Sequence, residues 1–126
     1  MADCAVLTGV SGQVTTTDAT PTNVLQIPIT DNGTNAVIIT TVAREQGLDD
    51  SRMWYQIALI DRTDSGMPSM KGSLSNLIAP FGDLGSVLWA VNLVFDSTNA
   101  YVQVTGEAGG TINWFSSLTN QYVCEV

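Results

Sequence analysis

Residues 99–114 read Asn99-Ala-Tyr-Val-Gln-Val-Thr-Gly-Glu-Ala-Gly-Gly-Thr-Ile-Asn-Trp114 and contain two segments of alternating polarity. The apolar residues that recur at every second position are Ala100, Val102, Val104, Ile112 and Trp114. Alternate residues of a strand point to the same side of a sheet, so each segment predicts a strand with one buried side. The glycines of residues 106–110 allow the positive φ angles of a short turn. The stretch therefore predicts a β-hairpin.

Trp114 is the expected centre of the core, because a buried Trp removes a large apolar area from water. Upstream, residues 86–95 form a strongly apolar segment in which Trp89 falls on the same face as its apolar neighbours. The residues that we expect in the core are Trp89, Val102, Val104, Ile112 and Trp114.

The remaining strands come at short intervals and are separated by turn residues. Residues 35–45 are rich in β-branched side chains, and residues 53–62 predict the returning strand of a hairpin. In that strand Met53 and Tyr55 share one face, and Trp54 on the other face either points to solvent or packs under a loop. Residues 23–30 predict another strand, and Pro28 within it removes a ladder donor, so this is an edge strand or contains a bulge.

These segments together predict an all-β protein. About eight short strands with no amphipathic helix are typical of an antiparallel β-sandwich or jelly roll. The length of 126 residues suits a single domain covering residues 1–126. We expect residues 1–12 to form a short strand or a terminal arm. Residues 66–85 are interrupted by glycine and proline, and we expect a long loop with one short strand near residues 74–78.

Composition restricts the class of partner. The chain is 44% hydrophobic and only 13% charged, and its formal net charge is −8. An acidic protein is repelled by phosphate backbones and by anionic membrane surfaces, so we expect neither nucleic acid nor membrane as a partner. A low charge content suits either a Thr/Ser-rich β domain that stands alone or a surface partly covered by neighbours in an assembly.

The two cysteines, Cys4 and Cys124, lie near opposite ends of the chain. The first and last strands of a sandwich are often neighbours, so a disulfide between them is geometrically feasible. It would close a very long loop and stabilise the fold by about 4–5 kcal/mol in the chain-entropy model. No signal peptide precedes Cys4, however, and cytoplasmic thiols normally stay reduced. A disulfide and two buried thiols both remain open.

Residues for common catalytic chemistry are missing. The chain has no histidine, which removes His-based triads and the commonest metal ligand. The acids Asp49, Asp50, Asp61 and Asp64 provide the carboxylates of a glycosidase, yet paired acids in loops are usually solvated turn residues. Asp31 and Asp49 lack the spaced pattern of a calcium loop. We therefore expect no enzyme activity, no catalytic or metal-binding residues and no cofactor.

Three stretches carry a family resemblance: Thr15-Thr-Thr-Asp-Ala-Thr-Pro21, Val42-Ala-Arg44 with Trp54-Tyr55, and residues 102–114. They resemble a family of small β-rich virion proteins and virion-protein modules of tailed bacteriophages. The resemblance is most specific in the third stretch, with its Val-Thr-Gly-x-Ala-Gly-x-Thr-Ile-x-Trp order. It implies a non-enzymatic structural role on the capsid surface or in tail fibres.

Two structural roles follow from the resemblance. The first is a capsid decoration (cement) protein, made in the host cytoplasm, which binds the major capsid protein as a homo-oligomer, with a trimer expected from the threefold sites of icosahedral shells. The second is a tail-fibre or receptor-binding module that recognises carbohydrate through exposed aromatics such as Trp54. A single short domain from Met1 to Val126 without shaft repeats favours the decoration role.

Overall fold

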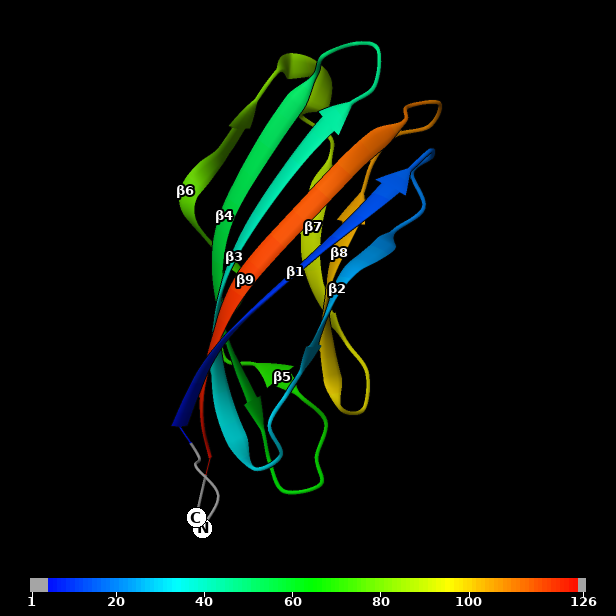
Figure 1. Ribbon diagram of the computed structural model, residues 1–126. Coiled ribbons are helices and arrows are strands. Elements are labelled where there is room, and N and C mark those ends of the chain that lie inside the picture. Colours follow the sequence, from blue (N-terminus) through cyan, green and yellow to red (C-terminus); the bar gives the residue numbers. More distant parts are fainter. Residues whose placement is uncertain (1–4, 125–126) are drawn as a thin grey trace.

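The computed structural model describes residues 5–124, and these residues form two antiparallel sheets packed as a sandwich (Figure 1). The strands are β1 (Ala5–Thr16), β2 (Thr22–Pro28), β3 (Gly33–Glu45), β4 (Ser51–Arg62), β5 (Ser69–Met70), β6 (Ser75–Gly82), β7 (Ala90–Phe95), β8 (Asn99–Thr105) and β9 (Ile112–Cys124). A short 3-10 turn, Leu84–Ser86, joins β6 to β7. The described residues contain no α-helix, and the predicted all-β antiparallel sandwich is confirmed.

The two sheets differ in size. The large sheet has the order β1-β9-β3-β4-β5, with β6 also paired to β4, and the small sheet has the order β2-β8-β7. Figure 1 shows β4, β3, β9 and β1 side by side as one long curved layer, with β7, β8 and β2 behind it. The hairpin expected from residues 35–45 and 53–62 forms as β3 and β4, and its register pairs Ile38 with Ile57.

The hairpin expected from residues 99–114 is wrong. β8 pairs with β2 and β7 in the small sheet, whereas β9 pairs with β1 and β3 in the large sheet. The connection between β8 and β9, residues 106–111, therefore passes from the small sheet to the large sheet. Both strands present a fully buried apolar face, including Val104 and Trp114, and these faces meet across the sandwich. The alternation predicted the two buried faces correctly, but alternation alone does not say whether adjacent strands pair or face each other.

Three indoles occupy the centre of the core. The ring centroids of Trp54 and Trp114 are 5.6 Å apart, and those of Trp89 and Trp114 are 5.9 Å apart. All five expected core residues are buried: Trp89, Val102, Val104, Ile112 and Trp114. The exposed position considered for Trp54 is wrong, because Trp54 is only 4% exposed while Tyr55 points outward. The physical reason is that Trp54 fills the space beside Trp114, which Met53 on the opposite face cannot do.

The edges of the sandwich are formed by strands with distinct features. β2 is an edge strand of the small sheet and carries Pro28, as expected, with a shift in register between Asn23 and Leu25. β1 is an edge strand of the large sheet, and it pairs with β9 over its whole length from Ala5 to Thr16. The described part of the expected terminal arm is therefore a sheet strand.

The segment from Gly66 to Gly85 contains more regular structure than expected. β5 and the eight-residue β6 both pair with β4, and β6 continues the large sheet at its far edge. Its side chains are largely exposed, including Leu77 at 43% and Phe81 at 56%. Glycine and proline therefore shorten the pairing here without abolishing it.

Candidate functional site

The outer face of the large sheet is the most unusual surface of the described chain. Residues such as Val37 and Ile39 of β3 point into the core and are fully buried, so their neighbours Ile38 and Val42 point outward. The strand registers align these outward residues in four rows across β1, β9, β3 and β4. We call this set the outer face: Leu7, Gly9, Ser11, Gln13, Ala36, Ile38, Thr40, Val42, Met53, Tyr55, Ile57, Leu59, Phe115, Ser117, Thr119 and Gln121.

The outer face combines exposed apolar side chains with a complete lack of charge. Leu7, Ile38, Val42, Leu59 and Phe115 are between 36% and 69% exposed. None of the residues of the outer face is Asp, Glu, Lys or Arg. Among residues 5–124, every charged side chain lies in a connection or within two residues of a strand end. Charge is thus concentrated at the two ends of the sandwich and excluded from its long side, although the whole chain carries −8.

The two halves of the outer face differ in side-chain size in the two middle rows. There the half over β3 and β4 carries Ile38, Tyr55 and Ile57, whereas the half over β1 and β9 carries Gly9 and Ser117; Leu7 and Phe115 lie in the outer rows of that second half. A shallow depression of about 600 Å³ lies between Gly9, Ser117 and Tyr55. We refer to the bulky half and the small half below.

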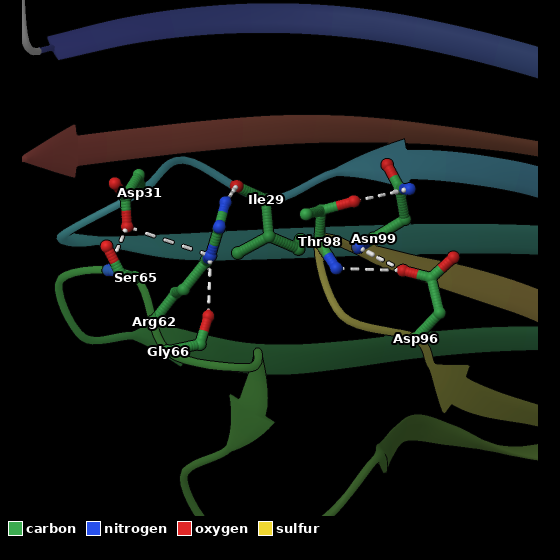
Figure 2. Close-up of polar contacts among 8 residues, drawn as sticks. All are labelled: Ile29, Asp31, Arg62, Ser65, Gly66, Asp96, Thr98 and Asn99. Atoms are coloured by element: carbon green, nitrogen blue, oxygen red, sulfur yellow. Dashed lines mark hydrogen bonds and ion pairs between the residues drawn. The ribbon is translucent and has the colours of Figure 1, made fainter.

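Arg62 links two connections at the end of the sandwich where β4 ends (Figure 2). Its guanidinium donates to the carbonyl oxygen of Gly66 over 2.8 Å and to that of Ile29 over 3.0 Å. The carboxylate of Asp31 lies 3.8 Å from Nε of Arg62 and accepts the backbone N–H of Ser65 over 2.9 Å. Since two of these partners are backbone groups, the arrangement orders loops and leaves little of Arg62 for a ligand.

Asp96 orders the neighbouring turn between β7 and β8. Its carboxylate accepts the backbone N–H groups of Thr98 and Asn99 over 2.9 and 2.7 Å (Figure 2). Its other oxygen accepts the hydroxyl of Tyr101. The Tyr101 hydroxyl, followed by these two backbone donors, lowers the pKa of Asp96 to about 2, and the same hydrogen bond raises the pKa of Tyr101. Asp96 is therefore an anionic turn residue.

The opposite end of the sandwich holds a pair of carboxyl groups. Glu45, at the end of β3, is only 4% exposed, its carboxyl group interacts with that of Glu107 from the connection between β8 and β9, and its Oε2 has no hydrogen-bond partner among the described residues. Two carboxylates cannot share a hydrogen bond unless one is protonated. The interaction with the Glu107 carboxyl group, burial, and the negative charges of Glu107 and Asp50 raise the pKa of Glu45. Glu107 also accepts the indole N–H of Trp89 over 3.2 Å, which holds the pair in place.

Trp54 does not provide the exposed aromatic surface that carbohydrate recognition was expected to use. Its indole lies at the bottom of an edge cleft of about 300 Å³ between β4, β6 and β7, lined also by Gln56, Asn76 and Asn92. The amide of Gln56 donates to Asn76 Oδ1 over 3.2 Å. With Trp54 only 4% exposed, no face of this indole is available for stacking on a sugar.

The acids considered for catalysis or calcium do not converge. Asp49 forms an exposed ion pair with Arg44 at 2.6 Å. Asp61 accepts the hydroxyl of Thr34 over 2.8 Å and lies 3.7 Å from Lys71. Among residues 5–124, no group of three His, Cys, Asp or Glu side chains is arranged to hold a metal ion. None of the helical segments in that range has the length and hydropathy to span a membrane.

The disulfide considered between Cys4 and Cys124 cannot be followed in full, because Cys4 lies outside the described residues. β1 and β9 pair as far as Ala5 and Val123, and the two cysteines are the chain neighbours of these residues. The bridge stays a prediction.

Sequence reasoning missed the outer face, although a signal was present. Alternation places Met53, Tyr55, Ile57 and Leu59 on one side of β4, but the strand is apolar on both sides, so alternation alone does not say which side is buried. Strands that are apolar on both sides are typical of sheets covered on both faces. In the described chain one of these faces has no cover.

Comparisons with protein-family models and with curated proteins found no match for the chain. Among solved structures, it is similar to the tailspike protein of Acinetobacter baumannii phage AM24. The two are 10% identical with a TM-score of 0.47, and the alignment covers 94% of this chain and 26% of the tailspike. The chain thus spans about a quarter of that protein's length. This similarity is too weak to assign a function or a site.

Proposed function

We propose that the chain is a structural module of a bacteriophage virion, which works through protein contacts and not through catalysis. The observation that carries this proposal is the outer face, an apolar and charge-free surface over four strands. Surfaces of this kind on soluble proteins mark contacts with other proteins when they exceed a few hundred Å². The family resemblance of residues 15–21 and 102–114 supplies the virion context.

Within the virion, we place the module in the tail, among fibre or receptor-binding proteins. The outer face lies over β1, β9, β3 and β4, which form a long side of the sandwich (Figure 1), and the charged side chains of residues 5–124 lie toward the two ends. This geometry suits lateral packing of elongated modules along a shared axis. The capsid surface, expected first, rested on the length of the chain, and neither the fold nor the comparisons support that location specifically.

Locating the protein on purified virions tests this proposal. Antibody fragments raised against the recombinant chain are coupled to gold and imaged on intact particles by electron microscopy. We expect label at the tail. Label over many capsid lattice points would replace the tail with the decoration role, and absence of the protein from purified virions by mass spectrometry would overturn the structural role itself.

A further inference from the structure

We infer that a second copy of this chain occupies the outer face, with the bulky half of one copy packed on the small half of the next. This assignment deepens the proposed structural role by naming the partner. It rests on three observations: the area of the face, the distribution of charge and the difference between its two halves.

The area is sufficient for a specific interface. Four rows about 6.6 Å apart, on four strands about 4.8 Å apart, cover roughly 500 Å². Two such faces bury about 1,000 Å² in total, which is near the lower end for a specific protein–protein interface. A face of this size is also as large as the largest patch of a typical monomer, which is about 300–600 Å² and often functional.

The charge distribution permits self-association of a strongly acidic chain. The repulsion between two copies that each carry −8 is screened as long as their charges stay in solvent. Here the charged side chains of residues 5–124 lie at the ends of the sandwich, so packing the faces together buries none of them. A partner recognised by charge would instead need charged residues on the face.

The two halves are complementary in size. Turning one copy about an axis parallel to the strands, between β3 and β9, exchanges the halves. The registers then bring Ile57 opposite Gly9 and Tyr55 opposite Ser11 of the other copy. At one end of the contact, Val42 of one copy lies opposite Phe115 of the other. This twofold packing uses both halves of each copy and closes as a dimer, whereas in a threefold ring each copy would share its two halves with two different neighbours.

The exposed edges of the large sheet offer a competing mode of association. β1 and β6 are edge strands, and edges can pair with other strands through their backbone groups. Pairing at an edge leaves the outer face exposed, so it does not account for the apolar surface.

Sedimentation equilibrium of the full chain over the micromolar range tests the inference. We expect a dimer or trimer. Val42→Arg in the bulky half and Ser11→Trp in the small half should each raise the dissociation constant at least about tenfold, since each places a charge or a large ring within a packed interface. Leu48→Arg, at an exposed leucine outside the face, adds the same charge as Val42→Arg and should leave association unchanged.

Several results would overturn the inference. A wild-type chain that stays monomeric at the highest concentration excludes it, as does an oligomer that both face variants leave intact. Circular dichroism melting of each variant at dilute concentration establishes that a loss of association is not a loss of folding. If Val42→Arg melts at a lower temperature than the wild type, Ile38→Lys replaces it in the bulky half. If Ser11→Trp does so, Thr119→Trp replaces it in the small half. The location of the protein on the virion is independent of these outcomes, so the two proposals fail separately.

Discussion

The indole N–H of Trp114 donates a hydrogen bond of 2.9 Å to the hydroxyl oxygen of Thr16. Trp114 lies on β9 in the centre of the core, and Thr16 is the last residue of β1. Both are buried, with exposed fractions of 1% and 4%. A buried indole needs such a partner because an unsatisfied donor costs free energy inside the protein. The bond therefore attaches the end of the edge strand β1 to the core.

Replacing Trp114 tests the centre of the core. Trp114→Ala should lower the free energy of unfolding by about 3–5 kcal/mol, the range for deleting a buried Trp. Thr16→Val should cost about 1–3 kcal/mol, because it leaves the indole N–H without its acceptor. Urea denaturation measures both. Leu84→Ala, at a side chain that is 91% exposed, is the control and should change stability by less than about 0.5 kcal/mol. A Trp114→Ala value as small as the control would contradict the assigned core.

The sequence predicted which faces are buried better than how the strands are arranged. Val102, Val104, Ile112 and Trp114 are buried as their alternation indicates, because a period of two records the side of a sheet directly. The same period is compatible with two strands that pair in one sheet and with two strands that face each other across the core. The predicted hairpin is therefore wrong, and β8 and β9 lie in opposite sheets. Only the contacts of distant strands decide between the two arrangements.

Other differences arise where both faces of a strand have similar polarity. β4 is apolar on each side, so alternation did not identify its buried face: Trp54 lies in the core and Met53 on the outer face. Polar core residues were equally hard to foresee. Thr41 and Ser116 share a buried hydrogen bond of 2.8 Å between β3 and β9, and the Asn35 amide donates to Asn120 over 2.9 Å. Each pair shares one hydrogen bond that depends on register and not on composition, and Oδ1 of Asn35 has no hydrogen-bond partner among residues 5–124.

The terminal cysteines give a prediction about redox state. The pairing of Ala5 with Val123 makes a bridge between the adjacent Cys4 and Cys124 feasible. If the bridge forms, a reducing agent should lower the unfolding midpoint, and the loss in free energy should be about 4–5 kcal/mol in the chain-entropy model. Thermal melting with and without reductant measures the effect. Two thiols that titrate in denaturant, with equal stability under both conditions, would exclude the bridge.

Arg62 should contribute more to stability than the exposed arginine at the other end of the sandwich. Its side chain is 14% exposed, and its bonds to Gly66 and Ile29 hold two connections. Arg62→Met should cost about 1–3 kcal/mol, because it leaves these carbonyl oxygens without their charged donor. Arg62→Lys should be nearly as destabilising as Arg62→Met, since an ammonium group does not present the planar fork of donors that a guanidinium does. Arg44→Ala is the control: its pair with Asp49 is exposed, and its loss should cost less than about 1 kcal/mol. Equal effects at both arginines would refute this view of the loop network.

Asp96 should give the fold part of its resistance to mild acid. Its pKa is lowered from 3.8 to about 2 in the folded chain, so the folded state favours the carboxylate. The contribution is present above pH 3.8 and is lost as the pH falls through about 2. Tyr101→Phe removes the largest cause of the lowered pKa while keeping the carboxylate. Melting curves between neutral pH and pH 2 should show a wild-type advantage over this variant that shrinks as the pH falls. An advantage that is constant over the whole range would mean that the titration of Asp96 is not its source.

Glu45 should stabilise the fold in acid and not at neutral pH, which is the opposite of the pH dependence expected for Asp96. The interaction with Glu107, burial and the nearby negative charges raise its pKa above 4.5, so the folded state favours the protonated carboxyl. Its contribution is therefore fully present below pH 4.5 and is lost as the pH rises through the higher folded-state value. Glu45→Gln keeps a neutral group that can donate to Glu107 at every pH. We expect this variant to melt above the wild type at neutral pH and to approach it in acid. Asp64→Asn, in an exposed loop, changes the net charge equally and should follow the wild-type curve. If Asp64→Asn stabilises as much as Glu45→Gln, the gain comes from reduced net charge and not from the buried carboxyl pair.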